Sequence, residues 1–452
     1  MSRIRLNPAI AALIVSSLLG STTASAGARH VRTNIAARLL IEIGQEQQRN
    51  SQQERGDRDD DDRADKIGTP VVVLETDLVG NLPQLVDRNH ILHAPFIIDP
   101  NLVNPWGLTE TSASPFWVSN NNAGVSTLYS VPGASNTPVS INSLVVSIPN
   151  PGDVLTATGT PTGAVFNVDL AGKGFEISGV AKNGTANSAP AIFLFATEDG
   201  TIVGWNPGVN PAGFDLNKAG TYGILAVDNS GGCGSPNGAV YKGLAIATDA
   251  GSGNTFLYAA NFRAGTIEVY DTSFKRVTLP PGAFTDSELP HGYAPFNVTL
   301  SGGVLFVTYA RQDKAKHDPV HGHGRGFVNT FDLSGHRLAR FASRGQLNAP
   351  WGVVRAPASF GQLAGVVLVG NFGDGQINAF DPTTGDFIGK VVNSKGEVIL
   401  IDGLWALMVG NGKNGGESAS IYFTAGPNGE TDGLFGSLSP VALGTPCGIP
   451  CR

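Results

Sequence analysis

A short phrase recurs along this chain: a turn that often contains proline, an apolar strand, a turn with asparagine or aspartate, and a second strand. Residues 104–107 (NPWG) lead to residues 116–121 (FWVSNN). The phrase returns at residues 349–352 (APWG), which lead to residues 366–372 (VVLVGNF). A repeated all-β unit of this size is the sequence signature of a β-propeller, in which each repeat forms one blade.

The spacing of the units predicts the number of blades. Strand-opening positions align at Trp106, Thr162, Leu244, Phe296, Trp351 and Trp405, in steps of 56, 82, 52, 55 and 54 residues. The long step contains Gly- and Asn-rich stretches at residues 172–189 and 208–220, which we expect to be insertions. Since six units fall within the ~4–8 blades of known propellers, the sequence predicts an all-β, six-bladed β-propeller.

The composition agrees with many short strands joined by tight turns. Glycine (59) and proline (28) are frequent, and only 15% of the 452 residues are charged. Apolar runs such as residues 365–369 suit strands buried on both faces, and residues 71–78 could supply a last strand that closes the ring. The net charge of −7, without a basic stripe, argues against a nucleic-acid surface.

The N-terminal residues predict export. Arg3 and Arg5 precede an apolar run at residues 9–19 and small residues at 24–26, a pattern typical of a secretory signal peptide. The run is too short to span a membrane. We therefore expect a signal peptide at residues 1–26 and a secreted or periplasmic protein.

The remaining boundaries follow from composition. We expect a disordered spacer at residues 27–68, which could include a short helix and whose acidic run could bind cations or only be solvated. The propeller should occupy residues 69–440, followed by a tail at 441–452. In an oxidising compartment Cys447 and Cys451 could form a local disulfide in this tail, or they could remain free thiols. Cys233 is expected to be a small buried loop residue.

Longer phrases resemble an uncharacterised family of exported bacterial six-bladed propellers, some members of which carry a PEP-CTERM sorting tail. They are residues 101–108 (NLVNPWGL), 195–202 (FATEDGTI), 260–262 (ANF), 265–267 (GTI), 370–373 (GNFG) and 423–429 (FTAGPNG). The resemblance covers about residues 69–439, and more distantly the blades are similar to NHL-type and lactonase-type propellers. It implies a fold but no activity, and this chain lacks the sorting tail.

Propeller geometry predicts where a site would lie. The turn before the innermost strand and the turn between the second and third strands share one face, and propellers carry their sites on such loops. This places the following residues at one mouth of the channel: Trp106, Asn120, Glu198, Asp199, Asn261, Asp313, Trp351, Asn371 and Trp405. Their oxygens could bind Ca²⁺, but Asn and Asp are also the ordinary residues of such turns. The tryptophans could stack on a ligand or pack between blades.

A second candidate site lies at residues 316–326 (KHDPVHGHGRG), in a long hairpin loop of the fourth unit. His317, His321 and His323 could hold a transition metal such as Zn²⁺ or Cu²⁺. The alternative is an exposed loop with incidental histidines.

These observations favour an exported, monomeric binding or scaffold module that presents one face to a small ligand or a partner protein. The alternative is a metal-dependent hydrolase of lactonase type, with Glu198 or Asp199 joined by Asn261 and Asn371 around Ca²⁺. A quinone-dependent dehydrogenase is disfavoured, because it needs a convergent basic and histidine-lined pocket. Whether carboxylates converge on the channel mouth should discriminate between these functions.

Overall fold

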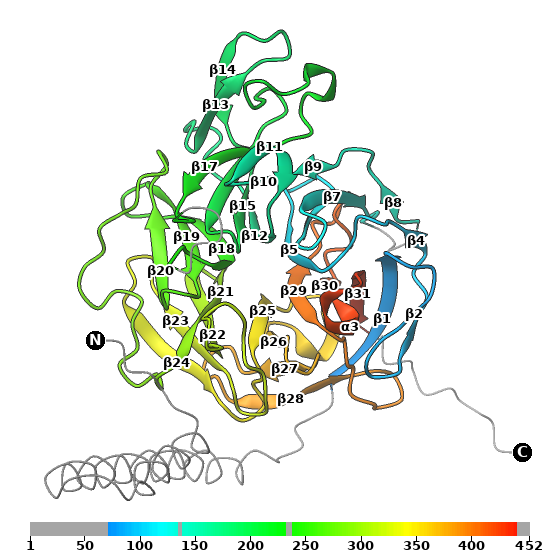
Figure 1. Ribbon diagram of the computed structural model, residues 1–452. Helices are drawn as coiled ribbons and strands as arrows, with labels where there is room; N and C mark the ends of the chain where they lie inside the picture. The colour runs from blue at the N-terminus through cyan, green and yellow to red at the C-terminus, as the bar shows by residue number, and fades with distance from the viewer. Residues whose placement is uncertain (1–70, 134–137, 232–236, 441–452) are drawn as a thin grey trace, which may run out of the picture. The chain divides into compact units, whose positions relative to one another are not determined.

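The computed structural model describes residues 71–133, 138–231 and 237–440, which form sheets arranged around a central axis (Figure 1). The innermost strands are β5 (Pro105–Thr109), β12 (Pro161–Phe166), β18 (Tyr241–Thr248), β21 (Tyr293–Ser301), β25 (Pro350–Arg355) and β29 (Leu404–Val409). These strands contact one another in this order, and β29 contacts β5 again. The innermost strands therefore form a closed ring.

Each innermost strand is followed by antiparallel partners, and we call each such group a blade. The second strands are β6 (Phe116–Asn120), β15 (Phe193–Thr197), β19 (Thr255–Asn261), β22 (Val304–Arg311), β26 (Val367–Asn371) and β30 (Ile421–Ala425). The third strands are β7 (Val125–Ser130), β16 (Thr201–Trp205), β20 (Thr266–Tyr270), β23 (Phe327–Phe331), β27 (Ile377–Phe380) and β31 (Leu434–Pro440). Residues 116–121 and 366–372 of the repeated phrase thus contain the second strands of the first and fifth blades.

The outer edges differ between blades. The outermost strands are β8 (Ser140–Ile141) and β9 (Val146–Ser147) on the first blade, β17 (Ile224–Asp228) on the second, β24 (Arg337–Ser343) on the fourth and β28 (Phe387–Val392) on the fifth. On the third blade β20 is the last strand described, and an isolated bridge joins Tyr270 to Arg276 beyond it.

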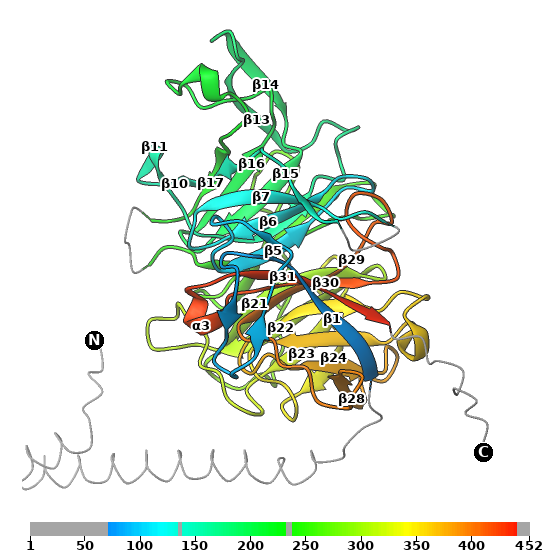
Figure 2. The ribbon, with the colours of Figure 1, turned by 90° about the vertical axis from the view of Figure 1, so that its right-hand side faces the viewer.

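The strand β1 (Val71–Gly80) completes the last blade, as predicted. It pairs antiparallel with β31, from Val73 opposite Pro440 to Gly80 opposite Leu434, and runs along the outside of the ring (Figure 2). Its first residues also pair with β28 of the neighbouring blade. The ring is thus closed by hydrogen bonds between segments from opposite ends of the described chain.

Short elements surround this closure and extend the second blade. A hairpin of β2 (Leu85–Val86) and β3 (Leu92–His93) follows β1, and β4 (Ile97–Ile98) pairs with β1. In the second blade β10 (Pro149–Asn150) pairs with β11 (Asp153–Thr158), and β13 (Glu176–Val180) pairs with β14 (Ala186–Pro190). The β13–β14 hairpin projects from the ring and confirms the insertion predicted at residues 172–189 (Figure 1). The helical turns are η2 (Leu216–Lys218), η3 (Gly361–Leu363) and α3 (Pro427–Glu430).

Crowding at the axis explains the glycine of the repeated phrase. A Cβ atom at Gly107 would collide with the carbonyl oxygen of Thr162 in the next blade, and one at Gly352 would lie 2.5 Å from the carbonyl oxygen of Trp405. Glycine therefore lets neighbouring innermost strands approach closely.

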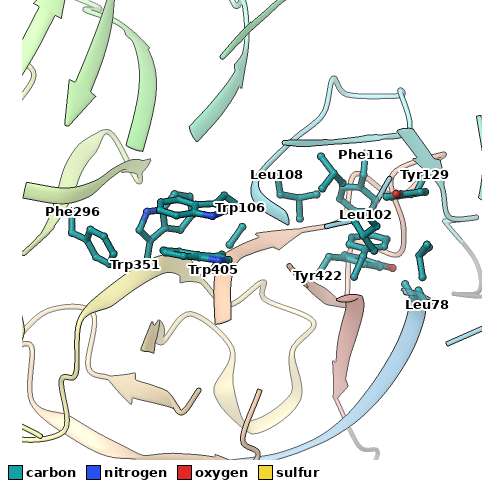
Figure 3. Close-up of a cluster of buried hydrophobic side chains, with 14 of the residues drawn as sticks. Leu78, Leu102, Trp106, Leu108, Phe116, Tyr129, Phe296, Trp351, Trp405 and Tyr422 are labelled. Atoms are coloured by element: carbon teal, nitrogen blue, oxygen red, sulfur yellow. The ribbon is translucent and has the colours of Figure 1, made fainter. Parts of the chain in front are cut away.

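The tryptophan of the repeated phrase fills the centre of the ring. Trp106 and Trp405 stack with ring centroids 3.5 Å apart, and Trp351 lies edge-on to both at 6.3 and 5.9 Å (Figure 3). All three are at most 4% exposed. Their contacts are therefore those of a packed aromatic plug. This is the alternative in which the tryptophans pack between blades.

The prediction of an all-β propeller is confirmed. The strand pairing is the pattern that six blades would produce, and the blade number stays a prediction. The predicted signal peptide, the spacer, Cys233 and the tail with Cys447 and Cys451 lie outside the described residues. No helix in the described part of the chain is long and apolar enough to cross a membrane.

Candidate functional site at the channel mouth

A cavity of about 330 Å³ opens at the mouth where the sequence placed the tryptophans. The innermost strands and the hairpin turns of several blades line it with Arg88, Trp106, Lys242, Asp318, Pro319, His321, Phe372, Gly373, Trp405, Gly429 and Glu430. The predicted Trp106 and Trp405 thus contribute to its wall, although both are packed among other rings. The charged side chains come from β18, from turns of other blades and from the segment after β1.

A larger cavity of about 580 Å³ is lined by other residues of the innermost strands. Most of its wall is aliphatic, including Leu108, Ile246, Val354 and Leu407, and Glu110 also contributes. Burial raises the pKa of Glu110 to about 9, so this carboxyl is neutral at physiological pH. Because ionisable groups converge at the smaller cavity instead, we take the smaller cavity as the candidate site.

The ammonium group of Lys242 is the centre of the site. Its side chain is only 1% exposed and forms ion pairs with Glu198 and, at 3.3 Å, with Asp318. The same Nζ lies 5.0 Å from the ring centroid of Trp106, a cation–π distance. A buried charge is tolerated only when it is paired. Three blades supply this pairing, since Glu198, Lys242 and Asp318 belong to the second, third and fourth.

The adjacent carboxylates of Glu198 and Asp199 have different roles. Glu198 points to Lys242, and its other oxygen accepts a hydrogen bond of 2.9 Å from the Asn121 amide. Asp199 instead accepts hydrogen bonds from the backbone N–H (2.7 Å) and the hydroxyl (2.9 Å) of Thr160. Of this predicted pair, only Glu198 reaches the site.

The long loop of the fourth blade brings Asp318 over Lys242. Asp313 fixes this loop, because its carboxylate accepts a 2.8 Å hydrogen bond from the backbone N–H of His317. The imidazole of His317 lies 2.8 Å from Asp318, and this contact raises the pKa of His317. Hydrogen bonding to His317 and the charge of Lys242 lower the pKa of Asp318 to about 2. Asp318 is therefore ionised at physiological pH.

Two further charged residues line the cavity. Burial, and then the nearby charge of Glu198, raises the pKa of Glu430, whose carboxylate accepts a 3.1 Å hydrogen bond from Asn104. Arg88 is anchored by Asp402, with 2.6 Å between Nη2 and Oδ1. The site thus offers both hydrogen-bond donors and acceptors around its opening.

The predicted turn asparagines bond within their own surroundings. The Asn120 amide donates to Thr127 (2.8 Å), that of Asn261 to Glu268 (3.1 Å), and that of Asn371 to Asp374 (3.1 Å). None of the three lines the cavity in the part of the chain that the structure describes. Their contacts are those expected of turn residues.

The trio of His317, His321 and His323 stays a prediction, and the structure places one of its members in a different group. Within residues 71–133, 138–231 and 237–440, two groups of three side chains are close enough to share a metal ion: Glu198, His317 and Asp318, and Glu75, Asp77 and His93. His317 therefore joins Glu198 and Asp318 instead of His321 and His323.

Sequence reasoning missed Lys242, although a signal for it existed. Gly107, Gly163, Gly243 and Gly352 occupy the same crowded position, where a Cβ atom would strike the next blade. Trp106 and Trp351 of the central cluster stand directly before Gly107 and Gly352, and Lys242 stands directly before Gly243. The third unit had been aligned on Leu244, two residues too late.

Comparisons with known proteins give relatives without established functions. No protein-family model matches the chain. Two uncharacterized proteins of Acanthamoeba polyphaga mimivirus are similar: one is 32% identical over 345 residues (75% of this chain, 76% of the relative), the other 33% over 362 residues (78% and 84%). These relatives are viral, so the resemblance to an exported bacterial family gains no support from them.

Solved structures with a similar chain path include enzymes and a binding protein. The PQQ-bound aldose sugar dehydrogenase of Streptomyces coelicolor has a TM-score of 0.38 and 11% identity (75% of this chain, 94% of that chain). A gluconolactonase of Xanthomonas campestris has a TM-score of 0.28 and 13% identity (59% and 86%), and a nidogen/laminin complex has 0.36 and 13% (74% and 96%). Similarity at this level says nothing about activity.

Proposed function

This chain belongs to the family of those uncharacterized viral proteins, and we propose that it is a propeller-type binding module that takes a small polar ligand at the channel mouth. The carrying observation is Lys242, a buried ammonium held between Glu198 and Asp318 beside an open cavity. Burying charges is expensive, and a hydrophobic plug alone would have closed the ring. Charged groups from three blades at one point therefore support a site.

The chemistry of the wall favours an uncharged, hydroxyl-rich ligand. Asp318 and Glu430 accept hydrogen bonds, whereas Lys242 and Arg88 donate them. Carboxylates at least balance the cations around the cavity, so an anion gains little there. A volume of about 330 Å³ is at the small end of ligand pockets, which suits a molecule the size of a monosaccharide.

The alternative is a metal-dependent hydrolase of lactonase type. Glu198, His317 and Asp318 are close enough to hold an ion, which favours this reading over a pure scaffold. The Ca²⁺ set of Glu198 or Asp199 with Asn261 and Asn371 has less support, since both asparagines bond elsewhere. A dication would also have to displace the ammonium of Lys242 from between its two carboxylates.

The test is a titration of the purified protein with neutral monosaccharides and, separately, with Ca²⁺. Tryptophan fluorescence reports on Trp106 and Trp405 in the cavity wall. We expect a saturable response to a sugar that Lys242→Met abolishes and that Lys275→Met, an exposed control, leaves unchanged. A response to Ca²⁺ alone, lost in Glu198→Gln, would favour the hydrolase, and no response to either would contradict both proposals.

Export and a monomeric state are part of this proposal and rest on the sequence alone. Residues 1–26 carry the signal-peptide pattern. N-terminal sequencing of protein recovered from the medium or periplasm should begin near residue 27, and light scattering should give one chain per particle. An uncleaved N-terminus on cytoplasmic protein would refute export.

A further inference from the structure

A second cluster of carboxylates around a histidine lies where the ring closes. Glu75 and Asp77 are two residues apart on β1, so their side chains point to the same side of the strand. His93 lies on β3, and Asp87 directly follows β2. The ligating atoms of Glu75, Asp77 and His93 all lie within 4.8 Å of one another. We call these four residues the closure cluster.

The imidazole of His93 is held between two carboxylates. Its side chain is 3% exposed, and Nδ1 lies 3.2 Å from both oxygens of Asp77. Nε2 lies 3.6 Å from Asp87, slightly long for a hydrogen bond. The Asp87 carboxylate is itself fixed by the backbone N–H groups of Asn89 (2.9 Å) and Ile91 (2.8 Å). The ring therefore has a defined orientation.

The closure cluster has more negative charge than its residues can balance. Three carboxylates face one imidazole, and within the described residues no lysine or arginine forms an ion pair with any of them. Other buried carboxylates do have such partners, as Asp286 has Arg337 and Asp402 has Arg88.

We propose that Glu75, Asp77 and His93 bind a divalent transition-metal ion of the Zn²⁺ type. Zn²⁺ takes imidazole nitrogen and carboxylate oxygen ligands, and three protein ligands leave a fourth position for water. A metal-bound histidine usually donates its other N–H to a carboxylate, and Asp87 stands beside Nε2. Ca²⁺ prefers six to eight oxygen ligands, so it should bind this cluster more weakly.

The expected consequence is a metal clamp on the ring closure. Glu75 and Asp77 belong to the strand that completes the last blade, and His93 belongs to the hairpin packed beside it. An ion joining them would hold the β2–β3 hairpin on β1. Because the ligand set exists only in the folded chain, binding should stabilise the folded state.

The experiment uses the full chain, stripped with EDTA and dialysed, with ZnCl₂, CoCl₂ and CaCl₂ as probes. We expect Zn²⁺ to bind one to one by calorimetry and to raise the melting temperature by several degrees, with little effect of Ca²⁺. Co²⁺ should give the visible absorption of a tetrahedral site. Glu75→Gln and His93→Gln should each weaken Zn²⁺ binding at least tenfold and remove the Co²⁺ band.

The matched control is His317→Gln, which changes the other carboxylate–histidine group and should leave Zn²⁺ binding unchanged. If His93→Gln fails to fold by circular dichroism, the partly exposed Glu75→Gln still decides the result. Absence of Zn²⁺ binding, or binding that survives Glu75→Gln and is lost in the control variant, would overturn the assignment.

Discussion

The channel mouth and the ring closure are built from the same kinds of side chain, two carboxylates and a histidine, but their charges are balanced differently. The channel mouth combines Glu198, His317 and Asp318, and the ring closure combines Glu75, Asp77 and His93. At the channel mouth Lys242 supplies a cation from the protein itself. At the ring closure no lysine or arginine in the described chain does so. A carboxylate–histidine group is thus a neutralised ion-pair network in one place and a candidate metal site in the other.

The position of each cluster in the ring explains this difference. Lys242 precedes the glycine that packs on the next blade, so its side chain reaches the axis where three blades meet. The strand β1 is the outermost strand of its blade, and only the hairpin after it covers Glu75 and Asp77. Arg88 is in that segment, but its guanidinium is used by Asp402, 2.6 Å away.

Removal of Lys242 should give the largest effect. Lys242→Met leaves Glu198, which is 11% exposed, without its cation, and such losses cost about 3–5 kcal/mol of unfolding free energy. Urea denaturation measures the change. The double variant Lys242→Met with Glu198→Gln should recover part of the loss, because no uncompensated charge remains. A double variant less stable than Lys242→Met would contradict this account.

Glu110 is a third case, a buried carboxyl that has neither a cation nor an imidazole as a partner among the described residues. Its pKa is raised to about 9 by burial, so the folded chain keeps a proton that the unfolded chain releases from about pH 4.5 upward. The contribution of Glu110 to stability should therefore fall as the pH rises through this window, by on the order of 3 kcal/mol between pH 5 and 8. Urea denaturation at several pH values gives the unfolding free energy as a function of pH. This free energy should depend less on pH in Glu110→Gln than in the wild type, and the exposed control Glu176→Gln should match the wild type.

Neutralising one carboxylate at the ring closure and one at the channel mouth should change the unfolding free energy in opposite directions. In metal-free protein at pH 8, Glu75→Gln removes a buried charge for which desolvation and repulsion by Asp77 outweigh the attraction of His93, so we expect a gain of about 1 kcal/mol. Glu198→Gln removes the main partner of buried Lys242 and should destabilise the fold. Thermal melting in EDTA compares the two directly. A loss of stability in both variants would mean that the closure cluster is already neutralised.

Most of the fold could be predicted because its signals are local. Alternating strands, Gly- and Asn-rich turns and the repeated Trp-Gly pair indicated the hairpins. The closing role of β1 followed from a strand left without a hairpin. The strand-opening alignment missed the equivalent position in the third unit, where Leu244 was taken for the position of Lys242.

The sites were harder to predict because they depend on contacts between distant segments. Glu198 was found because its turn differs from the other turns in carrying two acids. The path of the loop that carries the three predicted histidines also depends on distant bonds, such as that from the Gly322 N–H to Asn348. The closure cluster left no sequence signal, since β1 and His93 meet only through the folded path of residues 81–92.

The smallest predicted effect separates the two partners of Lys242. Asp318 is 66% exposed, whereas Glu198 is 11% exposed, although both form ion pairs with the same ammonium. Exposed pairs are worth less than about 1 kcal/mol and weaken in salt. Double-mutant cycles should therefore give a small, salt-sensitive coupling for Asp318→Asn with Lys242→Met, and a larger, salt-resistant one for Glu198→Gln. Equal couplings would mean that Asp318 is as closely committed to Lys242 as Glu198 is. That result would leave neither partner of Lys242 free to exchange the ammonium for a ligand hydroxyl.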